Sequence, residues 1–412
     1  MARGNIVTRK VADGSKRYDA CIRIEGRKKY KTFKLKNQAE AWLDRNSTDL
    51  REHTYREITP SSFRQYTDKW RKKYLIVEEL KPSTLGGYAC MLDRHLVPAF
   101  GHRPMAAITT GDITELRSEL IKGHGDVKAQ SSQSVKKIMN LLNRICGDAI
   151  EDGFLRVSPM PTRRRKSETT KASRRGRALQ PSEAQRLLEQ CETNAEEDRE
   201  ANPILKLTVL IGLLAGLRRG EIFALDWESI DWERDLIRVS RNLFWRYGKH
   251  YALAEDEPSF VIHEPKSATS SRDVDLSPTL KKELRIFYLQ CKSKHRSGLI
   301  FRSRENTPLD PHNVYERWFK PAVERARLKA AEEKDESAVK ALDGLHIHDL
   351  RHTFGSWKVA QGEDILYVSK QMGHARPSIT ADVYSHLLEK QRPQAAQKTD
   401  DFLFGTKATT AG

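Results

Sequence analysis

The sequence predicts a mainly α-helical protein with small β elements, and three observations predict it. Apolar residues recur at spacings of three and four between residues 60 and 160, and again after residue 276, which is typical of amphipathic helices. Short alternating stretches near residues 15–35 and 231–276 are typical of strands. A basic stretch that lacks large apolar residues, 161–177, separates two regions that are each long enough to form a domain.

The composition favours a polyanionic partner in a reducing compartment. The chain has 412 residues, and 73 Lys and Arg against 56 Asp and Glu give a net charge of +17. Neutralised phosphates release counterions, so this surplus favours nucleic acid, although a basic ribosomal or membrane-surface protein would share it. The five cysteines are scattered singly, which argues against a disulfide framework or a zinc site. Without a membrane-length apolar stretch or a signal region, we expect a cytoplasmic protein, associated with the nucleoid in a bacterial host.

Residues 1–56 form the first predicted unit. Residues 15–24 and 30–35 alternate as strands around a turn, and a helix with Ala39 and Trp42 on its apolar side follows them. Two or three basic strands on one helix can place a sheet face in a DNA groove. An ordinary basic hairpin with solvated lysines is an equally good interpretation of the pattern.

Residues 60–160 form the second predicted unit, a bundle of helices. The helices are expected to begin at Ser61 or Ser62, at Pro82, at Thr110, and at Ser131 or Ser134. Basic residues around their apolar stripes either line DNA or form a solvated face. Residues 161–177 are the predicted linker, which is either a disordered tether or a tether that wraps DNA.

Residues 178–404 form the largest predicted domain, which is mixed but mostly helical, and residues 405–412 a flexible tail. A helix over Pro203–Leu217 is apolar nearly throughout, so we expect it to be buried. Strands are expected at 236–239, 260–262 and 272–276, and helices after them.

This domain carries residues suited to cleaving a phosphodiester without a metal. Such cleavage needs a nucleophile, cations and donors around the phosphorane oxygens, and an acid for the departing oxygen. His348 and Arg351 are three residues apart, so they share a helix face, and a guanidinium grips two phosphate oxygens at once. The candidates, in chain order, are Arg218, Lys266, His348, Arg351, His374 and Tyr384.

Each of these fragments is ordinary when taken alone. An arginine-rich turn is commonly structural, a Gly-His pair is commonly a turn, and a tyrosine commonly uses its hydroxyl as the polar tip of a half-buried ring. Two neighbouring histidines, His346 and His352, lack an arginine three residues later. The rival nucleophile Tyr367 precedes the Gly-His turn and fits no motif.

Taken together, the residues resemble the tyrosine recombinase family of lambda-type phage integrases. The joint order Arg, Lys, His-x-x-Arg, Gly-His, Tyr is specific to that family. The resemblance implies that Tyr384 attacks the scissile phosphate to form a 3′-phosphotyrosyl linkage. It implies that the charge of the transition state is stabilised by Arg218, Arg351 and His374. It also implies that His348 acts as the base and Lys266 as the acid. Two mild departures from the family pattern are Met372 before the Gly-His turn and Ser267 after the lysine.

The resemblance also implies the architecture and the partners. Residues 1–56 would be an arm-type DNA-binding domain, 60–160 a SAM-like core-binding domain, and 178–404 the catalytic domain. The activity implied is site-specific recombination for a phage or mobile element, through a Holliday junction, without a cofactor or a metal. Implied partners are double-stranded DNA attachment sites, three further copies in a homotetramer, and an accessory DNA-bending protein or excisionase, with no membrane partner. Residues 387–404 would dock on a neighbouring protomer or else pack on their own domain.

Two alternative functions remain open from the sequence. A type IB topoisomerase shares the tyrosine chemistry without synapsis, and relaxation of a plasmid that lacks a specific site would favour it. A non-catalytic DNA-binding regulator on a recombinase scaffold would bind DNA without cleaving it. The presence of every motif residue argues against the regulator.

Overall fold

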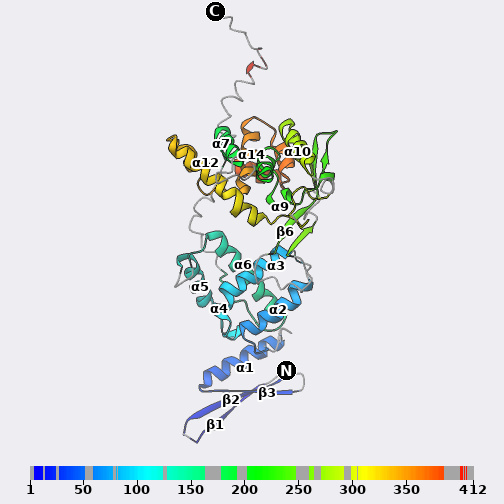
Figure 1. Ribbon diagram of the computed structural model, residues 1–412. Coiled ribbons are helices and arrows are strands. Elements are labelled where there is room, and N and C mark those ends of the chain that lie inside the picture. Colours follow the sequence, from blue (N-terminus) through cyan, green and yellow to red (C-terminus); the bar gives the residue numbers. More distant parts are fainter. Residues whose placement is uncertain are drawn as a thin grey trace, which may run out of the picture. The chain divides into compact units, whose positions relative to one another are not determined.

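The computed structural model divides into two compact units, Met1–Ser167 and Glu168–Gly412. Helices dominate both units and the sheets are small, which confirms the predicted fold class (Figure 1). None of the described helices is long and apolar enough to cross a membrane. The structure describes residues 4–12, 14–24, 27–51, 59–77, 80, 82–123, 128–162, 178–192, 202–246, 259–263, 271–291, 298–303, 305–384, 400–401, 403 and 405.

The N-terminal part of the first unit is a three-stranded antiparallel sheet covered by one helix. Its elements are β1 (Asn5–Lys10), β2 (Lys16–Ile24), β3 (Arg27–Phe33) and α1 (Lys36–Arg51), with β2 in the middle. Ala20, Ile22 and Ile24 of β2 pack against Ala39 and Leu43 of α1. The sheet therefore buries one face, while most residues of β1 and β3 stay exposed.

The rest of the first unit is a helical bundle with its own core. Its elements are α2 (Phe63–Val77), α3 (Pro82–Met91), η1 (Leu92–Leu96), α4 (Val97–Phe100), η2 (Met105–Ala107), α5 (Thr110–Lys122) and α6 (Ser132–Glu151). Trp70 is buried in this core, and its indole N–H donates to the carboxylate of Asp148 at 2.6 Å. Of the two predicted caps of α6, Ser131 is the one used, because its hydroxyl accepts from the amide of Ser134.

The second unit surrounds one buried helix with further helices and two small sheets. Its first elements are α7 (Pro181–Glu192), α8 (Pro203–Leu214), α9 (Arg219–Ile222), η3 (Trp227–Ser229), β4 (Ile230–Asp231), β5 (Leu236–Val239), β6 (Asn242–Trp245), β7 (Phe260–His263) and β8 (Arg272–Asp275). The later ones are α10 (Pro278–Gln290), α11 (Pro311–Val314), η6 (Tyr315–Phe319), α12 (Lys320–Glu332), α13 (Glu336–Leu342), α14 (Ile347–Ala360) and α15 (Ile365–Met372). The sheet orders are β4-β5-β8 and β6-β7, with antiparallel pairing throughout.

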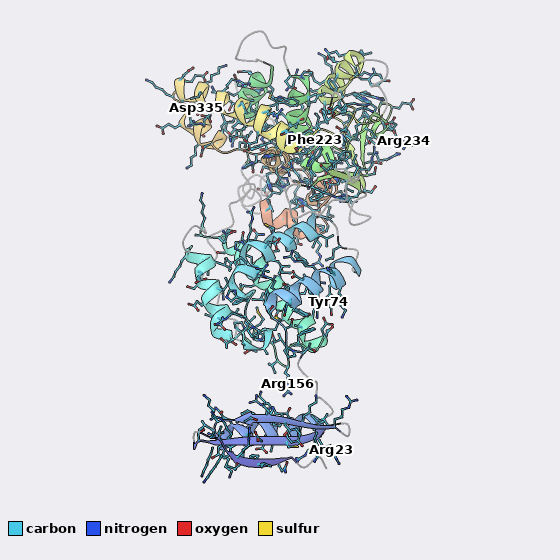
Figure 2. The ribbon with its side chains drawn as sticks, turned by 60° about the horizontal axis from the view of Figure 1, so that its bottom comes forward. Arg23, Tyr74, Arg156, Phe223, Arg234 and Asp335 are labelled. Atoms are coloured by element: carbon cyan, nitrogen blue, oxygen red, sulfur yellow. The ribbon has the colours of Figure 1, made fainter. Side chains whose placement is uncertain are left out.

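Helix α8 is buried as predicted, and it packs closely on α14. A Cβ at Gly212 would lie 2.8 Å from the Cβ of Leu350, so a glycine allows the two helices to approach. Figure 2 shows Phe223 within this unit and Arg234 near its edge, in keeping with a buried ring and an exposed guanidinium. The helix is shorter than predicted and ends at Leu214, because Gly216 adopts a left-handed conformation with φ of 62°.

Several predicted features fall outside the described residues. Residues 52–58 and 163–177 are not described, so the boundaries of the units 1–56 and 60–160 and of the linker 161–177 stay predictions. The same holds for Lys266 and for nearly all of the segment 387–404.

Candidate active site

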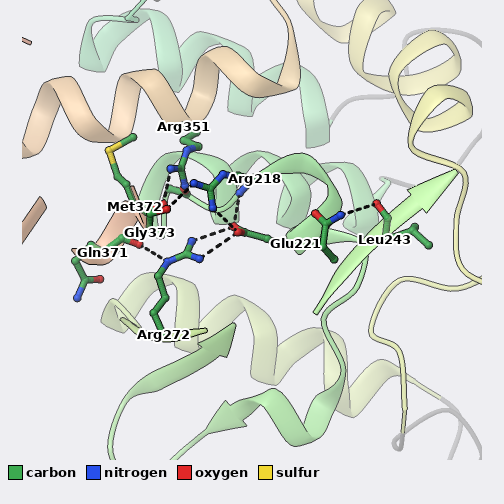
Figure 3. Close-up of polar contacts among 10 residues, drawn as sticks. Arg218, Glu221, Leu243, Arg272, Arg351, Gln371, Met372 and Gly373 are labelled. Atoms are coloured by element: carbon green, nitrogen blue, oxygen red, sulfur yellow. Dashed lines mark hydrogen bonds and ion pairs between the residues drawn. The ribbon is translucent and has the colours of Figure 1, made fainter. Parts of the chain in front are cut away.

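Two of the predicted arginines meet at the C-terminal end of α15, where Figure 3 shows their guanidinium groups. Arg218 donates from Nη2 to the carbonyl of Gly373 at 2.6 Å. Arg351 donates from Nη2 to the carbonyl of Met372. The last carbonyls of a helix have no partner within the helix, and the helix dipole favours cations there. The end of α15 therefore gathers positive charge from distant parts of the sequence.

Arg218 directly precedes α9 and is held by Glu221. The carboxylate of Glu221 accepts from the backbone N–H of Arg218 and from its Nη1, both at 2.8 Å. The Arg218 side chain remains 35% exposed. It is thus held in place but open to a ligand, as the sequence predicts for a residue that contacts phosphate.

Glu221 is buried and yet stays ionised. Burial by itself would raise the pKa of its carboxyl, but hydrogen bonds and charge from Arg272 and Arg218 outweigh burial and lower the pKa to about 2. A carboxylate at this position stabilises the arginines around it.

Arg351 lies on α14 and is only 2% exposed. Its Nη1 donates to the carbonyl of Gly216 at 2.6 Å, in addition to the bond with Met372. Burial, with a smaller contribution from the charge of Arg218, lowers the pKa of Arg351 to about 9, so the guanidinium stays charged at neutral pH. A buried cation fixed by two carbonyls is organised before any substrate arrives.

The turn at Gly216 makes this arrangement possible. Its φ of 62° is strained for residues with a side chain, and a Cβ there would lie 2.3 Å from the ring of Phe354. The Ala-Gly-Leu-Arg motif therefore ends α8, presents a carbonyl to Arg351 and leads directly to Arg218.

His374 follows a second left-handed glycine, Gly373, at the end of α15. Its Nδ1 lies 2.7 Å from the hydroxyl oxygen of the buried Thr380. Burial and the nearby charges of Arg351 and Arg218 lower the pKa of His374 to about 4, so the ring is neutral at pH 7. With Thr380 as the donor to Nδ1, the ring proton lies on Nε2, which can donate to a phosphate oxygen.

His348 lies one turn before Arg351 on α14 and is also neutral at pH 7. Burial, then the neighbouring His352 and Arg351, lower its pKa to about 4. Its ring meets that of His352 edge to face, with centroids 5.0 Å apart. It lines an open pocket of about 430 Å³ together with Arg219. A neutral imidazole beside an open pocket can accept a proton.

Tyr384 is 2% exposed and ends the described part of its helix, residues 377–384. Its hydroxyl donates to the carbonyl of His352 at 3.4 Å and lies 3.8 Å from the sulfur of Met372. Burial raises its pKa to about 12, although the charge of Arg351 opposes the rise. A Cβ at Gly355 would lie 2.3 Å from the hydroxyl oxygen, so a glycine is needed to leave space for the phenol.

The rival residues have other partners. The hydroxyl of Tyr367 donates to Asp275, and burial raises its pKa. His346 precedes α14, where its amide donates to Asp349 and its ring stacks on Tyr315 with centroids 4.9 Å apart. Both have contacts that account for them without a role in chemistry.

Sequence reasoning missed three contributors to the site. Arg272 of β8 grips Glu221, Gly355 makes room for the phenol, and Thr380 orients His374. No local pattern marks any of them, because each acts on a residue that is distant or on another element. Lys266, the predicted acid, lies outside the described residues.

Comparison with known proteins identifies the family. The sequence profile of the Phage integrase family matches residues 177–391, more than half of the chain. The chain belongs to this family. A second profile, the N-terminal SAM-like domain of phage integrases, matches residues 62–121 in the helical bundle. The protein is therefore a tyrosine recombinase of the integrase type, an enzyme of site-specific recombination.

Individual relatives agree with this assignment. The ICEBs1 integrase of Bacillus subtilis is 26% identical over 323 residues, which cover 78% of this chain and 79% of that protein. A putative prophage phiRv2 integrase of Mycobacterium tuberculosis is 25% identical over 84% of this chain and 81% of its own length.

Solved structures show the same fold. A Tn1549 transposon integrase in complex with a circular intermediate DNA is similar with a TM-score of 0.60 and 18% identity, over 77% of this chain and 93% of that chain. A lambda integrase dimer bound to a COC′ core site gives a TM-score of 0.53 and 16% identity, over 79% and 95%.

Proposed function

We propose that this integrase cuts and rejoins duplex DNA at the attachment sites of a phage or other mobile element, with Tyr384 as the nucleophile. One observation carries the proposal: two arginines and a neutral histidine converge at the end of α15, and Arg351 is close enough to the buried Tyr384 for its charge to oppose the rise in the tyrosine pKa that burial causes. Such a cluster suits a phosphodiester and a phenol that attacks it.

The proposed reaction balances without a cofactor. The hydroxyl oxygen of Tyr384 bonds to the scissile phosphorus, and the bond from phosphorus to the 5′ oxygen breaks. The phenol proton passes to the neutral ring of His348, and Lys266 gives a proton to the departing 5′ oxygen. The product is a 3′-phosphotyrosyl linkage. In the second step a 5′-hydroxyl of the partner strand attacks this phosphorus, and the bond from phosphorus to the tyrosine oxygen breaks. Exchange of strands in pairs then passes through a Holliday junction.

The charges of the cluster support this reaction. Attack by a phenolate on a phosphodiester gives a phosphorane with two negative charges. Arg218 and Arg272 bind the carboxylate of Glu221, and Arg351 lies within electrostatic reach of it. These three arginines and one carboxylate give the cluster two more positive than negative charges. The match favours the transition state over the singly charged substrate.

The resting position of Tyr384 sets the order of events. With a pKa raised to about 12, the phenol holds its proton at neutral pH, so the proton must leave as the oxygen attacks. The hydroxyl must also leave the carbonyl of His352, to which it donates. Loss of the proton requires a base near the hydroxyl, and the neutral His348 is one turn away from His352 on the same helix.

The partners we propose are DNA and further copies of the chain. Exposed cations of β3 support arm-type DNA binding by residues 1–56. A lambda integrase tetramer bound to a Holliday junction has a similar fold, with a TM-score of 0.52 and 16% identity over 89% of this chain and 92% of that chain. By analogy with it, four copies of this chain assemble on DNA. An accessory DNA-bending protein or excisionase is a further proposed partner, which the family resemblance implies.

Covalent trapping on nicked DNA tests the proposal. The substrate is terminal DNA of the host element. It carries a nick close to the scissile phosphate, so that the short fragment with the free 5′-hydroxyl diffuses away after cleavage and the covalent adduct accumulates. We expect an adduct on a denaturing gel from the wild type and from Tyr367→Phe, and none from Tyr384→Phe. An adduct that survives in Tyr384→Phe contradicts the assigned nucleophile. Binding without any wild-type adduct favours the non-catalytic regulator, and relaxation of a plasmid without a site favours a topoisomerase.

A further inference from the structure

Arg272, the first residue of β8, is a third buried arginine in the active-site cluster. Its side chain is only 7% exposed. Its Nη1 and Nη2 donate to the two carboxylate oxygens of Glu221 at 3.1 and 2.9 Å, and its Nε donates to the carbonyl of Gln371 at 2.7 Å (Figure 3). This one side chain therefore joins the carboxylate to the last turn of α15.

Three consecutive carbonyls at the C-terminal end of α15 accept from three arginines. The carbonyls belong to Gln371, Met372 and Gly373, and the donors are, in the same order, Arg272, Arg351 and Arg218. These arginines come from β8, α14 and the start of α9. The carbonyls at the end of one helix thus fix the spacing of the guanidinium groups. Arg272 binds the first of the three carbonyls in chain order.

Glu221 needs Arg272 whenever Arg218 engages a substrate. In the structure Arg218 and Arg272 share the Oε1 oxygen of Glu221. When Arg218 turns an N–H toward a phosphate, its hold on the carboxylate weakens. A buried carboxylate without a partner is costly. The two-point grip of Arg272 keeps Glu221 neutralised through this change.

The fit between Arg272 and Gly373 supports the same role. A Cβ at Gly373 would lie 2.8 Å from Nη1 of Arg272, and the φ of Gly373 is 62°. The backbone of β8 adds a further tie to α15, because the amide of Asp275 donates to the side-chain oxygen of Gln371 at 3.0 Å. Arg272 is therefore packed against the turn that leads to His374.

We propose that Arg272 is a positioning residue for the recombination reaction: it keeps Glu221 neutralised and holds the end of α15, so that Arg218 is free to bind the scissile phosphate. The inference rests on the phosphate-binding role proposed for Arg218. Arg272 itself does not touch the phosphate in this scheme, since its fork is already used by Glu221.

Cleavage of prebound DNA tests the positioning role. Arg272→Met keeps an unbranched apolar stem and removes the charged guanidinium, and Arg272→Lys keeps the charge without the fork. At saturating nicked DNA, we expect Arg272→Met to lower the rate of adduct formation about 100-fold, the scale of a small misplacement, with Arg272→Lys between it and the wild type. The affinity in a gel shift should change less than about threefold, because many phosphate contacts remain.

Arg238→Met is the matched control for this experiment. Arg238 lies on the neighbouring strand β5, and its side chain is 62% exposed beside Asp273. We expect this variant to cleave bound DNA at the wild-type rate. The proposal is overturned if bound Arg272→Met cleaves DNA at the wild-type rate. It is also overturned if the variant loses cleavage only to the extent that it loses DNA binding.

Thermal melting without DNA tests the pair of Arg272 and Glu221 separately. Glu221→Gln should lower the melting temperature of the wild type, because two arginines lose their carboxylate. It should raise the melting temperature of Arg272→Met, because it removes a buried charge that has lost its main partner. Equal shifts in both backgrounds overturn the proposed coupling.

The two experiments separate this inference from the proposed function. If the wild type forms no adduct while the melting shifts reverse sign, the proposed function fails, and Arg272 and Glu221 form a structural ion pair only. If the wild type forms the adduct and Arg272→Met matches it, the proposed function stands and the positioning role fails.

Discussion

The N-terminal sheet and the arginine cluster of the second unit are both strongly cationic, but they hold their charges differently. Lys28 and Lys31 of β3 are exposed on the strand. Arg272 and Arg351 are 7% and 2% exposed and donate to carbonyls or to a carboxylate. Exposed cations cost the fold little, whereas buried ones need fixed partners.

Exposed and buried cations suit different contacts with DNA. Exposed lysines interact with many phosphates, and each releases counterions, so they suit affinity that depends on salt. A buried guanidinium is already oriented and little hydrated, so it suits the stabilisation of a single phosphate whose charge rises during the reaction, directly as proposed for Arg351 or through Glu221 as proposed for Arg272. Breaking one region should therefore leave the property of the other intact.

The largest effect is expected from Arg351→Ala. We expect the cleavage rate of bound DNA to fall about 1,000-fold, since an oriented charge is lost from the transition state. Duplex affinity should stay nearly unchanged, because one contact among many phosphates is removed. Single-turnover trapping and a gel shift measure the two quantities side by side.

A melting curve is the control for this variant, because the carbonyls of Gly216 and Met372 lose a donor. Arg351→Lys keeps the charge and serves as the milder variant. If binding collapses while each bound complex still cleaves normally, the role assigned to Arg351 is wrong.

A smaller effect is expected from the double change Lys28→Gln and Lys31→Gln on β3. Binding to arm-type DNA should weaken roughly tenfold at moderate salt, and the slope of log affinity against log salt should fall by about 2. Cleavage of short core-site DNA should not change. An altered cleavage rate on core-site DNA, or an unchanged salt slope on arm DNA, would remove the arm-binding role from this sheet.

The smallest effect concerns the pH dependence of stability. Burial lowers the folded-state pKa values of His348 and His374 to about 4, below the usual value of 6.5 for an unfolded chain. The unfolded state therefore binds more protons at acidic pH. The neutral rings contribute stability that is fully present above pH 6.5 and is lost as pH falls toward 4.

Melting temperatures at pH 7.5 and pH 5 measure this dependence. In the window between pH 6.5 and 5 the histidines dominate, because the buried carboxyl of Glu221, with a pKa of about 2, stays ionised throughout. His348→Asn and His374→Asn should each flatten the decrease by a few degrees, and the double variant by more. Identical pH profiles for the wild type and the double variant would show that these rings titrate normally.

Much of the fold follows from local sequence pattern. The apolar stripes of α2, α5 and α6 and the capping residue Ser131 lie where helical periodicity and capping chemistry put them. The sequence predicts the end of α8 at Leu217, three residues beyond the observed end at Leu214, because the apolar run continues past the point where Gly216 turns the chain. Strand β6 carried too weak an alternation to be predicted, and it forms through its pairing with β7.

The candidate site divides in the same way. Five candidate residues, Arg218, His348, Arg351, His374 and Tyr384, follow from their order and spacing in the sequence, and their catalytic roles stay predictions. Their supports were not found, because Arg272 lies 51 residues from Glu221 and 99 from Gln371 along the chain. Contacts over such separations leave no local pattern.

The class of chemistry and the surplus of positive charge follow from the amino-acid sequence alone. Residue type limits which groups can attack, hold or protonate a phosphodiester, and the motifs place those types in a fixed order. The protonation states of the histidines and the partner of each arginine follow from the folded chain and not from local sequence. Those properties depend on burial and on carbonyls at the end of α15, and folding alone brings them together.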